Sequence, residues 1–158
     1  MEVVILKPMN DEEFKRFRRV SAAEYAEDKV KAGTWKQEEA LGLSEEAYAN
    51  YLPDGLRTRE HYFYSIRREN GEDSAGWIWL HVSDAPAGKR AFLYDIRLEE
   101  EYRGRGLGQA AMRALDETAR ALGASEIGLH VFGHNPAALR VYEKAGYAIT
   151  DYKMAKSL

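Results

Sequence analysis

Three runs of strand-forming residues follow one another in the middle of the chain, and their order constrains the fold more than any other feature. The first, His61 to Arg68, is rich in Tyr, Phe and Ile. Ala75 to Val82 and Ala91 to Leu98 each alternate two sets of side chains, so that each set lies on one face of its strand. The connectors between the runs are short enough for hairpins. The sequence therefore predicts an antiparallel sheet of three strands at its centre.

The alternation in the third run predicts which of its side chains share a face. One predicted face carries Phe92, Tyr94, Ile96 and Leu98, and the opposite face carries Leu93, Asp95 and Arg97. Asp95 interrupts an otherwise apolar strand, which makes it a candidate functional residue.

The segments around these runs predict an alternation of helices and strands. A short strand, Val3 to Leu6, precedes a helix that Asn10 or Asp11 can cap and that Gly33 ends, and Ser44 opens a second helix. After the three runs we expect a helix from about Gly104 to Leu122, a strand from Glu126 to Phe132, a helix from Asn135 to Ala145 and a last strand after Gly146. This order predicts a mixed α/β sandwich with an antiparallel half and a parallel crossover.

Length and composition narrow the class of protein. The 158 residues correspond to one domain, and the absence of cysteine excludes disulfide scaffolds and thiol nucleophiles and favours a reducing compartment. A net charge of -3 argues against a general nucleic-acid binder. The longest uncharged stretch, Ile127 to Leu139, has about 13 residues, fewer than the roughly 18 that a membrane span needs. The start of the sequence lacks the basic region of a signal peptide.

The segment Tyr102–Gln109 joins the third run to a helix and carries the most informative motif. Three glycines in five positions remove side chains where an extended ligand could lie against the backbone: Gly104, Gly106 and Gly108. The N–H groups of the first helical turn have no intrahelical partners and lie at the positive end of the helix dipole. Arg103 and Arg105 add positive charge. The motif is typical of a phosphate or pyrophosphate site. The alternative is a basic turn that only caps the helix.

A second motif lies at the next strand-to-helix corner. Asn135 precedes Pro136, and Tyr142 follows Asn135 by seven residues, so two helical turns place them on a shared face. Taken alone, Asn135 is explained as a helix cap and Tyr142 as a core aromatic.

Together, these two motifs resemble those of the GNAT superfamily of N-acetyltransferases. The acyl-CoA pyrophosphate loop of that family has the pattern Arg/Gln-x-x-Gly-x-Gly/Ala, which Arg103-x-x-Gly106-x-Gly108 matches. Asn135 and Tyr142 match later cofactor contacts of the family. The resemblance covers nearly the whole chain in element order.

The resemblance implies a single N-acetyltransferase domain over residues 1–158, with a mixed sheet of about six or seven strands, antiparallel in its N-terminal half and flanked by about four helices. It also implies acetyl-CoA as the acyl donor and no metal. The implied donor contacts include main-chain groups of the third run and residues of both motifs: Ile96, Arg97, Leu98, Arg103, Gly104, Arg105, Gly106, Leu107, Gly108, Gln109, Asn135 and Tyr142.

The implied reaction is direct attack of an amine on the thioester, with Tyr142 donating a hydrogen bond to the departing thiolate. Freeing the lone pair of an alkyl amine with a pKa near 10.4 costs about 4.6 kcal/mol at pH 7, so a base is needed. His130 stands five residues before Asn135, where some family members carry a glutamate, and Asp95 is the second candidate. We therefore expect Tyr142, His130 and Asn135 to form the catalytic group.

The resemblance places the acceptor between the first two helices and the strand ends. The polar and aromatic residues available there are Glu24, Tyr25, Asp28, Trp35 and Asp95. The alternative for Glu24 and Asp28 is that they belong to a charged helix face that only contacts water.

The sequence thus predicts a cytoplasmic acyltransferase that acetylates a small molecule, an amino acid or a peptide on a primary amine, without a nucleic-acid or membrane partner. Family members are often dimers, so a homodimer is left open. Two alternatives remain: a non-catalytic acyl-CoA-binding sensor, and the same fold with a different acyl-CoA donor such as succinyl-CoA.

Overall fold

The computed structural model describes residues 3–69 and 71–158. Its strands are β1 (Val4–Pro8), β2 (His61–Arg68), β3 (Ser74–Ala85), β4 (Gly88–Leu98) and β5 (Ala124–Leu129). Its helices are α1 (Asp11–Lys31), α2 (Gln37–Tyr51), α3 (Leu107–Ala121) and α4 (Pro136–Lys144), with short 3-10 turns at Gly55–Arg57 and Glu100–Tyr102. The order of elements up to α4 is the predicted one.

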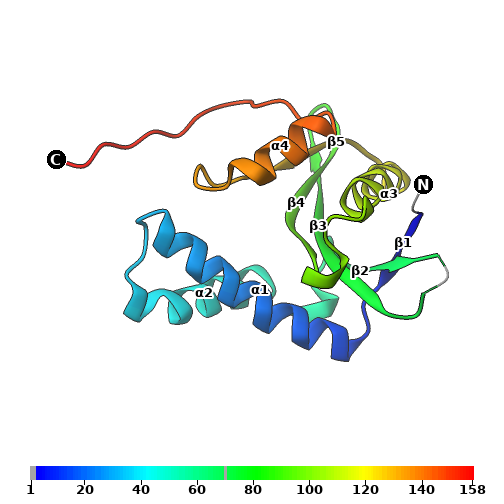
Figure 1. Ribbon diagram of the computed structural model, residues 1–158, viewed down its shortest axis with the longest axis horizontal. Helices are drawn as coiled ribbons and strands as arrows, with labels where there is room; N and C mark the ends of the chain where they lie inside the picture. The colour runs from blue at the N-terminus through cyan, green and yellow to red at the C-terminus, as the bar shows by residue number, and fades with distance from the viewer. Residues whose placement is uncertain (1–2, 70) are drawn as a thin grey trace.

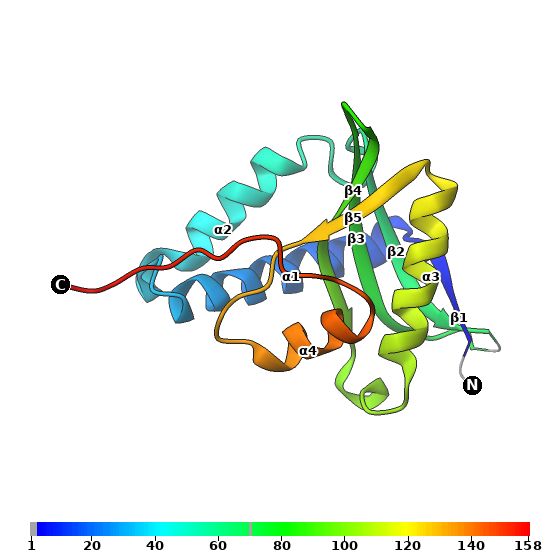
Figure 2. The same ribbon diagram turned by 90° about the horizontal axis from the view of Figure 1, so that it is seen from above.

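The five strands form one sheet in the order β1-β2-β3-β4-β5 (Figures 1 and 2). Neighbours from β1 to β4 are antiparallel, and β5 lies parallel to β4 after the crossover through α3. This arrangement confirms the predicted mixed sheet with an antiparallel N-terminal half.

Each face of the sheet is covered by a different pair of helices (Figure 1). On one face, aromatic side chains of α1 and α2 pack on Phe63, Trp77 and Trp79. On the other face, α3 buries Leu107, Leu115 and its alanines against the aliphatic residues of the strands, and α4 adds Tyr142 at the margin. Trp77 and Trp79 are almost fully buried, so they belong to the core.

One bulge in β4 changes the predicted faces of this strand. Trp79 pairs with Asp95 and the next residue of β3 pairs with Leu93, so Tyr94 has no opposite residue on β3. An extra residue on one strand reverses the alternation of side chains beyond it. As a result, Ile96 and Leu98 pack with Leu93 in the core beneath α3, and Tyr94 packs on the α1–α2 side. The predicted grouping of Phe92, Tyr94, Ile96 and Leu98 on one face is therefore wrong.

Helix α2 also differs from its prediction, because it begins at Gln37 and not at Ser44. Ser44 lies buried in the middle of the helix, where its hydroxyl donates a hydrogen bond of 2.6 Å to the Ala22 carbonyl oxygen of α1. The capping role expected of this serine is replaced by a bond between two helices. At the start of α1, Asn10 is the cap, and Glu13 completes a capping box.

The sheet has five strands in the described residues, fewer than the six or seven expected. The difference lies after Gly146, where residues 147–158 are extended but pair with no strand. None of the helices in the described part of the chain is long and apolar enough to cross a membrane.

Gly76 lets β3 and β4 approach closely at the point where β4 carries candidate donor contacts. A Cβ atom on Gly76 would lie 1.8 Å from the Arg97 carbonyl oxygen, so a side chain would force the two strands apart. We expect Gly76→Ala to lower the free energy of unfolding by about 3 kcal/mol, measured by urea denaturation.

Gly42 is the matched control for this substitution. It lies inside α2, and no atom lies within 4 Å of the position that an added methyl group would take. Gly42→Ala should therefore raise stability by about 1 kcal/mol through helix propensity. Equal unfolding midpoints for the two variants would contradict the close approach of β3 and β4.

Candidate active site

The site begins where β4 and β5 separate. Their pairing ends at Leu93 and Leu129, whereas β4 continues to Leu98 with only β3 beside it in the described residues. Backbone groups of β4 beyond Leu93 are therefore free to bind a ligand on the side that faces away from β3. Ile96, Arg97 and Leu98, the expected main-chain contacts, lie in this stretch.

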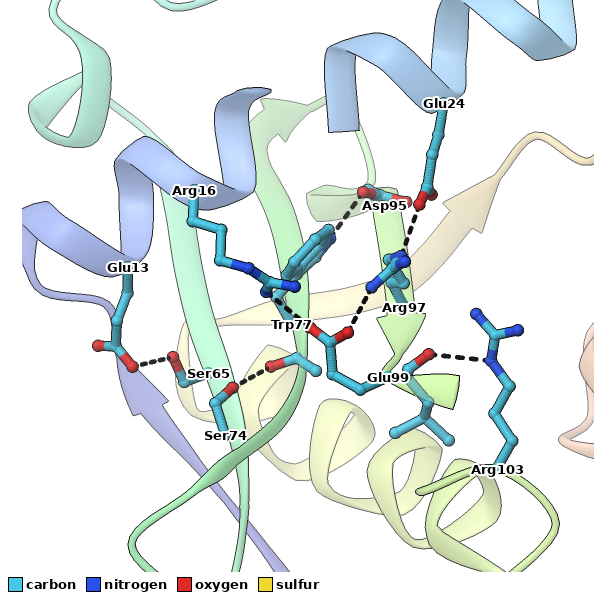
Figure 3. A network of polar contacts seen from close by, with 12 residues as sticks. Glu13, Arg16, Glu24, Ser65, Ser74, Trp77, Asp95, Arg97, Glu99 and Arg103 are labelled. Carbon is cyan, nitrogen blue, oxygen red and sulfur yellow. Dashed lines mark hydrogen bonds and ion pairs between the residues drawn. The ribbon is translucent and has the colours of Figure 1, made fainter. Parts of the chain in front are cut away.

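Asp95 is held in this stretch by two donors from different elements. Ser21 Oγ of α1 and Trp77 Nε1 of β3 each donate a hydrogen bond of 2.8 Å to Asp95 Oδ2 (Figure 3 shows the Trp77 bond). Tyr48 of α2 extends the network through a 2.7 Å bond to Ser21. Among the described residues, no hydrogen bond reaches Asp95 Oδ1. Burial raises the pKa of the Asp95 carboxyl, and the two hydrogen bonds offset part of this effect.

Tyr142 approaches the same stretch from α4. Burial raises the pKa of its phenol, and the charge of the Asp95 carboxylate raises it further. The Tyr142 ring also packs edge-on against Tyr147, with ring centroids 6.0 Å apart. The structure thus brings together two site residues that lie far apart in the sequence.

The glycine-rich motif forms the corner before α3, as predicted. Gly104 and Gly106 adopt left-handed backbone conformations, with φ of 72° and 79°, and no heavy atom lies within 4 Å of either Cβ position. Arg103 and Arg105 are exposed, and Arg103 Nε donates a 3.0 Å hydrogen bond to the Leu98 carbonyl oxygen. The helix itself begins at Leu107, three residues later than expected. The open corner and the free N–H groups of the first turn of α3 fit a pyrophosphate group.

The other two residues of the expected catalytic group lie around the end of β5. Asn135 caps α4 by accepting a 3.2 Å hydrogen bond from the Ala138 backbone N–H, with Pro136 as the first helical residue. His130 follows the last residue of β5 and is exposed, and its ring lies edge-on to Phe132 at 4.8 Å.

The expected acceptor residues line α1 and the link to α2, and the two carboxylates already have partners. Glu24 Oε1 lies 2.6 Å from Arg97 Nε, and Asp28 Oδ1 lies 3.0 Å from His134 Nε2. Tyr25 and Trp35 meet edge-on at 5.6 Å. Each of the three carboxylates keeps one oxygen without a described partner, but Asp95 is the one whose bonded partners, Ser21 and Trp77, are uncharged.

Arg97 joins this region to the rest of β4. The Arg97 guanidinium donates hydrogen bonds to the carboxylates of Glu24 and Glu99, and Arg16 of α1 donates a further one to Glu99 (Figure 3). Basic and acidic side chains therefore alternate along a chain of ion pairs that links α1 to β4. Hydrogen bonds from Arg16 and Arg97 lower the pKa of the Glu99 carboxyl, although partial burial alone would raise it. This chain of ion pairs fixes α1 over the carboxyl-terminal half of β4.

The sequence analysis did not predict three residues of the site: Ser21, Tyr48, and Trp77 as a hydrogen-bond donor to Asp95. Ser21 was detectable, because it lies four residues after Phe17 on the buried face of α1, where a polar side chain needs a partner. Nothing local in the sequence connects Tyr48 or Trp77 with Asp95.

No cluster of three or more His, Cys, Asp or Glu residues that could hold a metal ion occurs within residues 3–69 and 71–158.

Comparison with known proteins shows which family has this architecture. The family model described as "Acetyltransferase (GNAT) family" matches residues 23–147. The chain is 44% identical over 153 residues to the N-acetyltransferase YdgE of Bacillus subtilis, with 97% of each chain covered. It is 42% identical over 155 residues to the N-acetyltransferase YycN of the same organism, with 98% of this chain and 99% of that protein covered.

Solved structures agree with these sequence matches. The crystal structure of Bacillus subtilis YycN superimposes with a TM-score of 0.94 over 99% of each chain. An acetyltransferase structure from Pyrococcus furiosus, at 24% identity, shares the fold with a TM-score of 0.71. These matches agree with the separation of β4 and β5 and with the glycine-rich corner before α3. The chain belongs to the GNAT family and is an N-acetyltransferase.

Proposed function

We propose that this protein transfers the acetyl group of acetyl-CoA to a primary amine of a small molecule, an amino acid or a peptide, and that residues 1–158 act as one catalytic domain. The observation that carries the proposal is the free edge of β4 beside the glycine-rich corner before α3, with Asp95 on this strand and Tyr142 close enough to feel its charge. One group is a carboxylate with a free oxygen, and the other is a phenol that keeps its proton. The absence of cysteine suits a reducing compartment, which favours the cytoplasm.

The proposed donor site runs from the corner before α3 to the free edge of β4. The corner offers two left-handed glycines, two exposed arginines and the first-turn N–H groups of α3 to the pyrophosphate. The backbone of Ile96 to Leu98, in which the Leu98 carbonyl oxygen already accepts a bond from Arg103, would then hold the extended arm of the donor, as a strand holds a peptide. In this arrangement the thioester lies between Asp95 and Tyr142.

Asp95 is our first candidate for the residue that receives the amine. Its Oδ2 is used by Ser21 and Trp77, which leaves Oδ1 to accept a hydrogen bond from the acceptor ammonium. Since burial raises the pKa of this carboxyl, it is a stronger base than an exposed aspartate. His130 is the second candidate, because it follows the last residue of β5 and lines the same groove as Tyr142.

The reaction itself is a balanced substitution at the thioester carbonyl. The amine nitrogen forms a bond with the carbonyl carbon, the carbon–sulfur bond breaks, and the sulfur leaves as a thiolate. Tyr142 donates a hydrogen bond to this sulfur, and the proton that completes the thiol comes from the new ammonium. The raised pKa of the Tyr142 phenol supports the role of donor, because full transfer of its proton to a thiolate of pKa near 8.5 is unfavourable.

The test is release of free thiol from acetyl-CoA in the presence of polyamines, amino acids and short peptides. We expect at least one class of acceptor to raise release well above the rate without acceptor, and the acetylated product to be detectable by mass spectrometry. Binding of acetyl-CoA without acceptor-dependent release from any class would contradict the proposal and favour a non-catalytic sensor.

A further inference from the structure

One face of α1 lies against β4 beside the candidate base. Ser21 Oγ donates a hydrogen bond to Asp95, and one turn later Glu24 accepts a hydrogen bond from Arg97 of the same strand. Figure 3 shows the Glu24 side chain reaching from α1 toward Asp95 and Arg97. This part of α1 therefore lies next to the position proposed for the acceptor amine.

The same face of α1 continues to the segment that follows β5. Four residues after Ser21, the centroid of the Tyr25 ring lies 6.5 Å from that of the Phe132 ring. Seven residues after Ser21, Asp28 Oδ1 lies 3.0 Å from His134 Nε2. Residues at these spacings share one face of a helix. This face therefore reaches from β4 to the residues after β5, and it forms one wall for an acceptor whose amine is bound at the base.

Lys29 follows on this face, and two aromatic rings hold its ammonium group. Lys29 Nζ lies 5.6 Å from the centroid of the Tyr25 ring and 5.3 Å from that of the Trp35 ring. The two rings meet edge-on, with their planes at 90°. The Trp35 backbone N–H also donates a 3.3 Å hydrogen bond to the Lys29 carbonyl oxygen, which keeps the indole beside the lysine. The cation is therefore ordered before any ligand binds, which lowers the entropy lost on binding.

The Lys29 ammonium has no carboxylate partner in the part of the chain that the structure describes. The neighbouring Asp28 is bonded to His134. The positions three and four residues to either side of Lys29 carry no acid: Tyr25, Ala26, Ala32 and Gly33. The lysine is also half-buried, and a half-buried charge gains more from a counter-ion than an exposed one does. Lys29 is therefore a fixed positive charge that an anion from outside the chain can neutralise.

We propose that the acceptor carries a carboxylate as well as the reacting amine, and that Lys29 binds this carboxylate while Asp95 receives the amine. The inference deepens the proposed function and rests on it, because it needs an acceptor whose amine lies at Asp95. It assigns Lys29 a role in selecting the acceptor, with Tyr25 and Trp35 as the residues that position its ammonium group.

The geometry of α1 sets the distance between the two ends of the acceptor. Lys29 stands eight residues after Ser21, which corresponds to about 12 Å along the helix axis. Its side chain leans back over Tyr25, which lies about 6 Å beyond Ser21. The carboxylate thus lies roughly 6 to 12 Å from the amine.

This distance defines a class of acceptor. Each residue of an extended peptide spans at most about 3.5 Å, so two or three residues cover the distance and a single α-amino acid is too short. A dipeptide or tripeptide with a free carboxyl end fits, and so does an ω-amino acid of the same length. The chemistry they share is a primary amine and a carboxylate at the two ends of a short chain.

Glycine peptides of increasing length test this spacing, with thiol release from acetyl-CoA as the readout. Glycine, diglycine, triglycine and tetraglycine are each compared with their carboxyl-terminal amide. We expect kcat/KM to be highest for diglycine or triglycine and to exceed that of the matching amide by about tenfold or more. The ω-amino acids with the same number of bonds between amine and carboxylate show whether the peptide groups are also recognised. Equal kcat/KM for acids and amides, or glycine as the best acceptor, would overturn the inference.

Substitution of Lys29 tests the residue itself. Lys29→Met keeps an apolar stem on the two rings and removes the charge, so we expect the KM for the best acid to rise about tenfold, with kcat and the KM for acetyl-CoA within about twofold. Lys29→Arg should retain the preference for the acid over its amide. Lys31→Met is the matched control, because Lys31 lies in the same last turn of α1 but is exposed, and this variant should behave as wild type. An unchanged preference for the acid in Lys29→Met would contradict the assignment.

Calorimetric titration with triglycine, in the absence of acetyl-CoA, separates this inference from the proposed function. We expect wild type to bind triglycine about tenfold more tightly than Lys29→Met does, and more tightly than it binds triglycine amide. If no acceptor raises thiol release, the proposed transfer fails, but a difference in binding of this size still supports a carboxylate site at Lys29. Equal binding by the two proteins, or no binding by wild type, would overturn the site whatever the thiol assay gives.

Discussion

Replacement of Tyr142 by phenylalanine is expected to lower kcat by about 100-fold, or about 2.7 kcal/mol of transition-state stabilisation, with little change in the KM for acetyl-CoA. The phenol is partly buried, and both its burial and the charge of the Asp95 carboxylate raise its pKa. It therefore enters the reaction protonated and can donate to the sulfur only as negative charge develops there. Removing an interaction that exists only in the transition state lowers kcat and leaves ground-state binding intact.

Tyr147→Phe is the matched control for this measurement. Tyr147 contacts Tyr142 edge-on, and its hydroxyl is buried without a hydrogen-bond partner among the described residues. Loss of that hydroxyl should leave kcat within about twofold, because it removes no bond. Equal losses in the two variants, or an unchanged kcat in Tyr142→Phe, would remove Tyr142 from the reaction. Steady-state thiol release with the best acceptor of the panel supplies the readout.

Asp95→Asn is expected to lower kcat/KM for the amine by about 100-fold or more, while binding of acetyl-CoA persists. The amide oxygen of asparagine can keep both hydrogen bonds, because Ser21 and Trp77 donate to the same carboxylate oxygen. The substitution therefore replaces only the free oxygen and removes the negative charge. Asp84→Asn, an exposed carboxylate near the far end of β3, is the control and should retain activity.

The pH dependence of Asp95→Asn separates a base from a residue that only supports the fold. The raised pKa of Asp95 predicts that wild-type activity falls as pH decreases through that pKa, above the usual 3.8, and that the variant lacks this limb. A raised pKa in the folded state also means that the ionised carboxylate costs stability. That cost is present above the raised pKa and disappears as pH falls below the unfolded value. Asp95→Asn should therefore unfold at higher temperature than wild type at neutral pH and show no such gain under acidic conditions. An acidic limb that persists in the variant would assign the base to another group, with His130→Gln as the next test.

Local patterns predicted most of the strands and helices. The run from His61 to Arg68 forms β2 with the predicted bounds, and Gly33 and Gly123 each lie within two residues of a helix end. These features depend on side-chain periodicity and on glycine, which act over a few residues. Helix α2 was predicted to begin seven residues late, because Ser44 resembles a cap in sequence but bonds the Ala22 carbonyl in the structure. A contact between two helices overrode the local signal.

The candidate site was predicted in part for the same reason. The corner from Arg103 to Gly108 is a local motif, and the structure places it at the start of α3. By contrast, Glu24 and Asp28 were expected to be available to an acceptor, and the structure gives them Arg97 and His134 as partners. The partners lie 73 and 106 residues away in sequence, a separation over which no periodic pattern carries information.

The missing last strand has a related cause. A last strand was expected after Gly146. An extended segment becomes a strand only when a neighbour accepts its backbone hydrogen bonds, and the described residues of the single chain offer none that it reaches.

The order of the elements, the antiparallel half of the sheet and the glycine-rich corner could all be predicted from the amino-acid sequence, because each depends on residues that are close along the chain. The orientation of the catalytic strand could not, because it depends on tertiary pairing. The bulge at Tyr94 reverses the faces of β4 beyond it, so that Asp95 meets Ser21 and Trp77 on the α1 side. A bulge arises from the pairing of two strands, and one extra residue moves every later side chain to the opposite face.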